Sequence, residues 1–166
     1  MVHAVKSLVV DIGGNNVKVL VSGQGAPRKV PSGPTLTAAR MAASVRRAVA
    51  DWPYDAVAIG FPGPVADGHP AKEPANLGRG WVRFDYERAF GKPVRLVNDA
   101  VMQALGSYRG GRMLFLGLGT GLGAALVVAG HIQPLEIAHL PYRDGRTYED
   151  FLGKRGLGRM GQKCWR

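Results

Sequence analysis

The sequence contains a single cysteine, Cys164, and lacks a long hydrophobic run. One cysteine excludes a disulfide within the chain and a cysteine-rich zinc site. The first six residues lack the apolar core of a signal peptide, and no apolar run reaches the ~20 residues of a membrane helix. We therefore expect a cytoplasmic protein that does not enter a membrane.

Acidic residues are also scarce, with 12 Asp and Glu against 22 Lys and Arg, which gives a net charge of +10. Such a balance favours a polyanionic partner: a polyphosphorylated substrate, a nucleic acid or an anionic surface. The basic residues are scattered along the chain and do not alternate with aromatic residues. We therefore expect no nucleic-acid partner.

Glycine is abundant, and the stretch Gly117–Gly123 (Gly-Leu-Gly-Thr-Gly-Leu-Gly) holds four of the 24 glycines. Apolar runs at 113–116 and 124–128 flank it, so we expect two strands joined by a glycine-rich loop. Consecutive backbone N–H groups in such a loop can surround an anion. The stretch is either a phosphate-binding turn or a hairpin with a structural role alone.

The remaining periodicities predict an α/β protein. The expected order is strands at 7–12, 17–21 and 28–30, a helix at 35–51 capped by Thr35, a strand at 56–60, a short helix at 85–90, a strand at 94–97 and a helix at 100–107. This is the order of a ribonuclease-H-like half, the fold of actin-like ATPases and hexokinases. We expect a complete N-terminal lobe over residues 1–108 and a partial second lobe over 109–166.

Three segments carry weaker patterns. Residues 66–80 have no period and predict a long structureless loop, and such loops are often functional. The secondary structure of residues 134–139 is ambiguous from the sequence pattern. Thr147 to Asp150 form a capping-box pattern that predicts a helix start, whereas residues 162–166 predict no closing element.

Two acidic positions are candidates for phosphate chemistry. Asp11 precedes the Gly13-Gly14 turn, and a carboxylate beside backbone amides suits Mg²⁺ and phosphate, although Asp also caps turns. Asp99 follows Asn98 at the expected end of a strand, where ligands of α/β sheets gather. Asp99 is either a base that accepts a hydroxyl proton or the N-cap of the next helix, or both.

Polar side chains suited to a sugar occur elsewhere. Glu136 and His139 are three residues apart and share a face if they lie on a helical turn. They combine an acceptor with a donor for sugar hydroxyls, or they are ordinary surface residues. Asn76 lies in the expected loop and is either a ligand-binding amide or a turn residue.

Taken together, six segments resemble motifs of the ROK family (repressors, open reading frames, kinases) of sugar kinases, in the family's order. They are Asp11-Ile-Gly-Gly14, Gly60-Phe-Pro-Gly-Pro-Val65, Asn76-Leu-Gly-Arg-Gly-Trp81, Val97-Asn-Asp-Ala100, Gly117–Gly123 and Glu136-x-x-His139. The segments 145–153 and 161–166 are similar to the polyphosphate glucokinase branch of that family.

The resemblance implies a glucokinase that uses polyphosphate or ATP, with Mg²⁺ and without zinc. Asp99 would be the general base, and Asn76, Asn98, Asp99, Glu136 and His139 would bind the sugar. The phosphate-binding set would be Asp11, Gly13, Gly14, Asn15, Lys18, Gly119, Thr120 and Gly121, with Asp11 near Mg²⁺, directly or through water. The resemblance also implies a homodimer in the full-length protein.

Departures from the family pattern keep a second interpretation open. Asn15 replaces a Thr or Ser, and Ala138 replaces the Gly of Glu-x-Gly-His. Family kinases continue for roughly half as many residues again, so we expect a C-terminally truncated chain. The alternative to a kinase is therefore an impaired sugar-binding sensor or an inactive kinase fragment. A repressor is not expected, because the first strand begins within about ten residues of Met1 and no helix-turn-helix precedes it.

Overall fold

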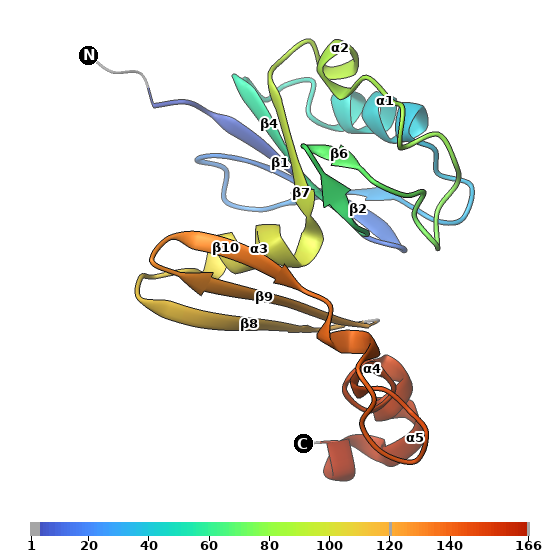
Figure 1. Cartoon of the computed structure of the whole chain (residues 1–166). Helices are drawn as coiled ribbons and strands as arrows, with labels where there is room; N and C mark the ends of the chain where they lie inside the picture. Colours follow the sequence, from blue (N-terminus) through green and yellow to red (C-terminus); the bar gives the residue numbers. More distant parts are fainter. Residues whose placement is uncertain (1–3, 120, 166) are drawn as a thin grey trace. The chain divides into compact units, whose positions relative to one another are not determined.

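The computed structural model describes residues 4–119 and 121–165, and the chain forms two compact units, Met1–Asp99 and Ala100–Arg166. Each unit has its own main sheet (Figure 1). Within the described residues, no helix is long and apolar enough to cross a membrane.

The first unit is built on a five-stranded sheet in the order β3-β2-β1-β4-β7. The strands are β1 (Ser7–Ile12), β2 (Asn16–Val21), β3 (Arg28–Pro31), β4 (Ala56–Phe61) and β7 (Val94–Asn98). β2 is antiparallel to both β1 and β3, whereas β1, β4 and β7 are mutually parallel. This order confirms the ribonuclease-H-like fold that the pattern of strands and helices predicts.

The core of the first unit lies on the face of β1 that carries Leu8, Val10 and Ile12, all fully buried. Helix α1 (Ala38–Ala48) adds Met41 and Val45 to the same cluster. The helix is shorter than the predicted 35–51. Thr37, not Thr35, is the N-cap, because its side chain accepts a hydrogen bond from the Arg40 amide while residues 33–36 form a turn.

Residues 66–80 are not the structureless loop that their composition predicts. They contribute to a two-stranded hairpin, β5 (Val65–Ala66) and β6 (His69–Pro70). Asp67 and Gly68 turn it with φ of 50° and 75°, and an Asp-Gly pair is a strong local signal for such a turn. The following α2 (Tyr86–Phe90) confirms the prediction, with Asp85 as N-cap and Gly91 as the left-handed C-cap.

The second unit begins at Ala100, the second residue of α3 (Asp99–Ser107). It continues as a three-stranded antiparallel sheet in the order β10-β9-β8. Its strands are β8 (Arg112–Leu118), β9 (Leu122–Val128) and β10 (His131–Leu135). The hairpin between β9 and β10 turns at Ala129 and Gly130, with φ of 49° and 79°. The sequence did not predict β10, because proline is unfavourable in most strands and β10 contains Pro134. β10 is an edge strand, where proline is tolerated.

Helical elements complete the second unit. They are the 3₁₀ turn η1 (Ile137–His139), α4 (Tyr148–Leu152) and α5 (Lys154–Trp165). The helix start at Thr147 is confirmed, since its amide and hydroxyl both donate to Asp150 Oδ2 at 3.0 Å. The prediction of no closing element was wrong. The glycines of α5 have low helix propensity, so the sequence pattern did not indicate this helix. The helix is kinked at Gly161, where φ is 73°.

Candidate functional site

The carboxyl ends of three parallel strands meet at one edge of the first sheet. The register pairs Asp11 of β1 with Gly60 of β4, and Gly60 with Val97 of β7. Asn98 and Asp99 follow this row directly. The structure therefore brings Asp11, Gly13 and Gly14 to the same sheet edge as Asn98 and Asp99, where ligands of open α/β sheets bind.

The turn after β1 is tight. The Gly13 amide donates to the Asn16 carbonyl oxygen at 3.1 Å, and a Cβ on Gly13 would lie only 2.8 Å from that oxygen. A side chain at Gly13 would therefore force the turn open. The Ser32 amide donates to the Asn15 carbonyl at 3.1 Å, which holds the turn against the end of β3.

Asp11 sits beside this turn with its carboxylate partly buried. Burial raises the pKa of the Asp11 carboxyl, and the positive charge of Lys18 opposes that rise. Lys18 is the cross-strand partner of Asp11 in the β1–β2 register. A partly desolvated carboxylate next to turning backbone amides is suited to hold a cation that also contacts phosphate.

Asn98 closes the other end of the row. Its Nδ2 donates to the Gly63 carbonyl oxygen at 3.1 Å, so the side chain connects β7 to the turn after β4. That turn is stiff, because two prolines flank Gly63 and the Gly63 amide donates to Phe61 O at 2.9 Å. Asp99, partly exposed, is the first residue of α3 and is therefore held by both a strand end and a helix start.

The segment around Asn76 is anchored on both sides of the exposed amide. Trp81 is fully buried, its indole N–H donates to the Gly78 carbonyl at 2.6 Å, and its amide donates to the Glu73 carboxylate at 3.2 Å. Leu77 is buried as well. Gly78 donates to Leu36 O at 3.0 Å, and a Cβ there would lie 3.0 Å from that oxygen. The backbone of this segment is thus fixed while Asn76 stays accessible.

In the second unit, the glycine-rich loop joins β8 and β9, as predicted. Gly119 and Gly121 lie in it, and Thr120 lies outside the described residues. The Gly119 amide donates to Gly121 O at 3.0 Å, and Gly119 O accepts from the Lys154 amide at 3.0 Å. The first turn of α5 therefore holds the loop.

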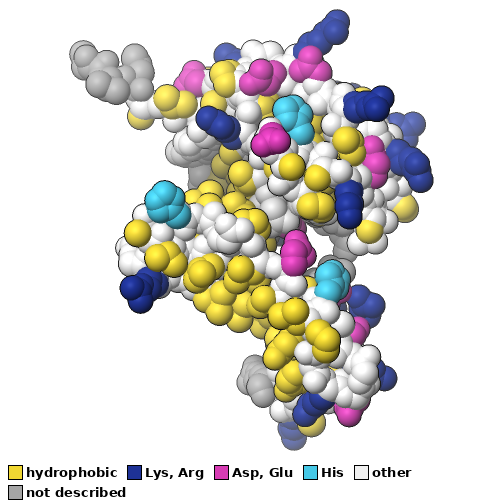
Figure 2. Space-filling model, viewed as in Figure 1, with side chains coloured by type: hydrophobic (Ala, Val, Ile, Leu, Met, Phe, Trp, Pro, Cys, Tyr) yellow, Lys and Arg dark blue, Asp and Glu magenta, His cyan; other side chains and the backbone are white. Residues whose placement is uncertain are grey.

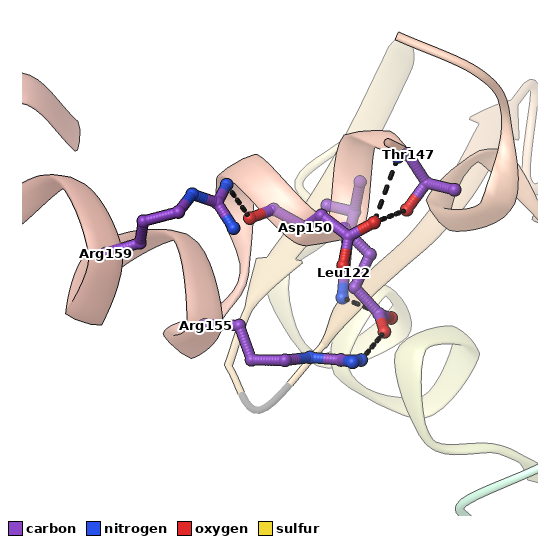
Figure 3. A network of polar contacts seen from close by, with 6 residues as sticks. Leu122, Thr147, Asp150, Arg155 and Arg159 are labelled. Atoms are coloured by element: carbon purple, nitrogen blue, oxygen red, sulfur yellow. Dashed lines mark hydrogen bonds and ion pairs between the residues drawn. The ribbon is translucent and has the colours of Figure 1, made fainter. Parts of the chain in front are cut away.

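Glu149 of α4 contacts the glycine-rich loop, and the sequence did not indicate this contact. Its Oε2 accepts from the Leu122 amide at 3.3 Å, and its Oε1 accepts from Arg155 Nη2 at 2.9 Å (Figure 3). A Cβ on Gly121 would collide with the same carboxylate. In the sequence Glu149 belongs only to a capping pattern, and nothing in its spacing from the loop indicates this contact.

Glu136 and His139 lie at the two ends of η1, with Glu136 at the N-cap position, and both are exposed. Glu136 therefore stands just before the 3₁₀ turn and His139 ends it. Ala138 between them is buried, which places its methyl group inside the unit. The pair is accessible to a polar ligand.

The acidic and histidine side chains of the described residues form no group of three or more that would hold a metal ion. The carboxylate of Asp11 nevertheless suits Mg²⁺, which proteins often bind through one or two carboxylates plus substrate phosphates. Two cavities of the first unit lie elsewhere. The larger of them, of about 750 Å³, opens at the start of β7 and is lined by His69, Arg83 and Arg95 among others.

Searches with the sequence found no matching family model and no matching curated protein. Solved structures do match. The polyphosphate/ATP-glucomannokinase of Arthrobacter sp. strain KM superposes with a TM-score of 0.77 at 27% identity, covering 95% of this chain and 72% of that one. A ROK family glucokinase from Streptomyces griseus, solved with glucose and AMPPNP, gives 0.77 at 24%, covering 95% and 60%.

The ROK hexokinase of Thermus thermophilus gives a TM-score of 0.69 at 26% identity, covering 93% of this chain and 62% of that one. The structural neighbours of this chain thus include ROK family sugar kinases, which confirms the resemblance that the motifs indicate. The chain spans 60% to 72% of the length of these three proteins.

Proposed function

We propose that this chain, which folds like the ROK sugar kinases, transfers a phosphoryl group from polyphosphate or ATP to the 6-hydroxyl of glucose. The observation that carries the proposal is the row of strand ends in the first unit, where the Asp11–Gly14 turn shares a sheet edge with Asn98 and Asp99. The similarity to a polyphosphate/ATP-glucomannokinase at 27% identity supports the same chemistry.

In this mechanism Asp99 is the general base. The 6-hydroxyl oxygen attacks the terminal phosphorus of the donor, a new O–P bond forms, and the bond from phosphorus to the leaving oxygen breaks. The hydroxyl proton passes to the Asp99 carboxylate. The leaving group is ADP or a polyphosphate shortened by one unit.

We assign the other residues to sugar binding or phosphate binding by their positions in the structure and in the motifs. Asn98, Asn76, Glu136 and His139 are proposed to hydrogen-bond the sugar hydroxyls, since they offer donors and acceptors on accessible or anchored backbone. The turn residues Asp11, Gly13, Gly14, Asn15 and Lys18, with Gly119, Thr120 and Gly121 of the loop, are proposed to bind the donor phosphates. Positioning and charge stabilisation then provide most of the rate enhancement.

Mg²⁺, held at Asp11 together with donor phosphate oxygens, would supply positive charge against the charge that develops on the phosphoryl group. The net charge of +10 supports a polyanionic donor, because a strongly basic protein attracts a long phosphate chain more strongly than a single nucleotide. Polyphosphate is therefore the donor we propose first, with ATP as the second.

A second candidate function is a sugar-binding protein without turnover. Two residues support it: Asn15 offers no hydroxyl where the family has one, and Ala138 replaces a family glycine between Glu136 and His139. An assay of the 166-residue chain with glucose, Mg²⁺ and each donor separates the two. Glucose 6-phosphate formation supports the kinase, whereas glucose binding without product supports the binding protein.

A further inference from the structure

The segment that ends the second unit is strongly basic. Residues 141–165 contain six Lys and Arg against three Asp and Glu. Figure 2 shows Lys and Arg side chains on the surface over α4 and α5. Part of the net charge of +10 is therefore concentrated on one segment, and this segment contacts the glycine-rich loop.

The first turn of α5 connects the basic segment to the loop. The Lys154 amide donates to Gly119 O at 3.0 Å, and Arg155 Nη2 donates to the Glu149 carboxylate at 2.9 Å. The same carboxylate accepts from the Leu122 amide at 3.3 Å. Lys154 and Arg155 are both exposed. Two basic residues of α5 are therefore joined to the loop that we propose binds the donor phosphates.

Arg159 lies one turn further along α5. Residues four apart share a helix face, so Arg159 follows Arg155 on the same side of α5 at a rise of about 6 Å. Arg159 Nη2 donates to the Asp150 carbonyl oxygen at 2.7 Å, and both arginine side chains reach from α5 toward α4 (Figure 3). The basic side chains thus form a line that starts beside the loop and continues along α5.

The Phe151 ring holds a second arginine near Arg159. Cζ of Arg159 lies 5.0 Å from the ring centre, and Cζ of Arg143 lies 4.7 Å from it. The two charges are therefore no farther apart than these two distances together. The ring attracts each guanidinium group and so fixes its position, while both residues stay exposed. Arg143 comes from the turn before α4, so two separate segments bring positive charge to one place.

Nearby carboxylates do not neutralise this arginine pair. Neither Arg143 nor Arg159 forms an ion pair with a carboxylate of the described residues. The Asp150 carboxylate accepts from the amide and the hydroxyl of Thr147, and these bonds are the main reason why the pKa of Asp150 is lowered. The charges of Arg155 and Arg159 lower that pKa less. Like charges held close together repel each other, and a bound anion would offset that repulsion.

Four exposed basic residues thus follow one path from the loop. They are Lys154, Arg155, Arg159 and Arg143, and we call them the basic track. We propose that the basic track binds the part of a polyphosphate chain that extends beyond the phosphates at the loop. Every further phosphate brings negative charge to the track, whereas a nucleotide ends in an uncharged nucleoside. This inference rests on the proposed function and adds to it the residues that favour polyphosphate over ATP.

The test compares long-chain polyphosphate with tripolyphosphate, which has no chain beyond the phosphates at the loop. A coupled assay for glucose 6-phosphate should give the wild-type chain a lower KM for the long chain. Arg143→Gln/Arg159→Gln removes the two charges at Phe151 and should lose at least about tenfold of that preference. Arg143→Lys/Arg159→Lys should keep most of it, because the charges remain although the planar guanidinium groups are lost.

The matched control is Arg40→Gln/Arg47→Gln, which removes two exposed arginines from α1 of the first unit. Its chain-length preference should equal that of the wild type, and circular dichroism verifies that each variant folds. A wild-type chain without this preference, or an Arg143→Gln/Arg159→Gln variant that keeps it, would overturn the proposal. So would single-stranded DNA whose binding depends equally on the two arginines, since that result indicates a surface for any polyanion.

Isothermal titration with long-chain polyphosphate keeps this test separate from the proposed function. If the 166-residue chain forms no product with either donor, the proposed function fails, but the titration still measures what the two arginines contribute to binding. Binding that is tighter than for tripolyphosphate, and at least about tenfold weaker in Arg143→Gln/Arg159→Gln, supports the basic track. Equal binding by the wild type and this variant overturns it.

Discussion

Asn98 donates a hydrogen bond from its side-chain amide to the carbonyl oxygen of Gly63 at 3.1 Å, and this contact connects the ends of β7 and β4. Asp99 follows immediately, so the position of the proposed base depends on this link. We expect Asn98→Ala to lower the free energy of unfolding by about 1 kcal/mol, the value of one such bond. Urea unfolding measures that loss.

The same variant should raise the KM for glucose and lower kcat, because the carboxylate of Asp99 loses its support on the strand side. The matched control is Gln24→Ala, which also truncates an amide side chain to a methyl group, at an exposed position in the turn between β2 and β3. Equal kinetics for Asn98→Ala and Gln24→Ala would remove the positioning role.

Asp99→Asn should reduce kcat about 10²- to 10⁴-fold, the usual contribution of a general base, while glucose still binds. The amide keeps the size of the side chain but does not accept the hydroxyl proton. A coupled assay for glucose 6-phosphate gives kcat, and titration with glucose gives the affinity. Near-normal turnover would show that another residue is the base.

Asp11→Asn should separate stability from activity. The folded-state pKa of Asp11 is raised by burial, so the folded chain holds this proton more tightly than the unfolded chain does. Stability contributed by this group therefore falls as pH rises above the ordinary value of 3.8. At pH 7 the variant should unfold at higher denaturant concentration than the wild type, and the difference should vanish below pH 3.8.

Activity of Asp11→Asn should be strongly reduced, because the variant lacks the carboxylate that we propose holds Mg²⁺. Lys18→Met is the informative partner variant: it removes the charge that offsets burial of Asp11, so its stability at pH 7 should fall. An Asp11→Asn protein that is less stable than the wild type at pH 7 would contradict the assignment of burial as the dominant effect.

Gly121→Ala should displace Glu149, because the new Cβ would collide with its carboxylate. The Leu122 amide and Arg155 would then lose their acceptor, at a cost of about 1 kcal/mol. Thermal unfolding compares this variant with Gly119→Ala, whose Cβ would meet nothing within 4 Å. If both variants melt alike, Glu149 does not hold the loop.

The sequence predicted the elements whose signals are local. Ser7–Ile12, α2 with its Asp85 and Gly91 caps, and the β8–β9 hairpin all follow from alternation or capping residues. α5 and β10 did not, because glycines and Pro134 conceal elements that tertiary contacts stabilise. Gly156 illustrates this: a Cβ there would collide with the Phe151 carbonyl, so close packing requires the residue that weakens the helix.

The residues of the candidate site also divide into those that sequence motifs indicate and those that only tertiary packing brings together. Motifs indicated Asp11, Asn98 and Asp99. The register shows that β1 and β7, which carry Asp11 and Asn98, end at one sheet edge, and Asp99 directly follows β7. The contact of Glu149 with the Leu122 amide joins residues 27 apart. No spacing rule covers such a pair, since it arises only once α4 and the loop have been packed.

The difference in strand connection between the two sheets has a consequence for the order of folding. β8, β9 and β10 follow one another through short turns, whereas β1 must find β4 across the whole of β2, β3 and α1, as in the Ser7–Ala56 pair. Local hairpins form in about 1–10 μs, and long-range parallel pairing is slower. The three-stranded sheet of the second unit is thus expected to form before the five-stranded sheet of the first, although its residues come later in the chain.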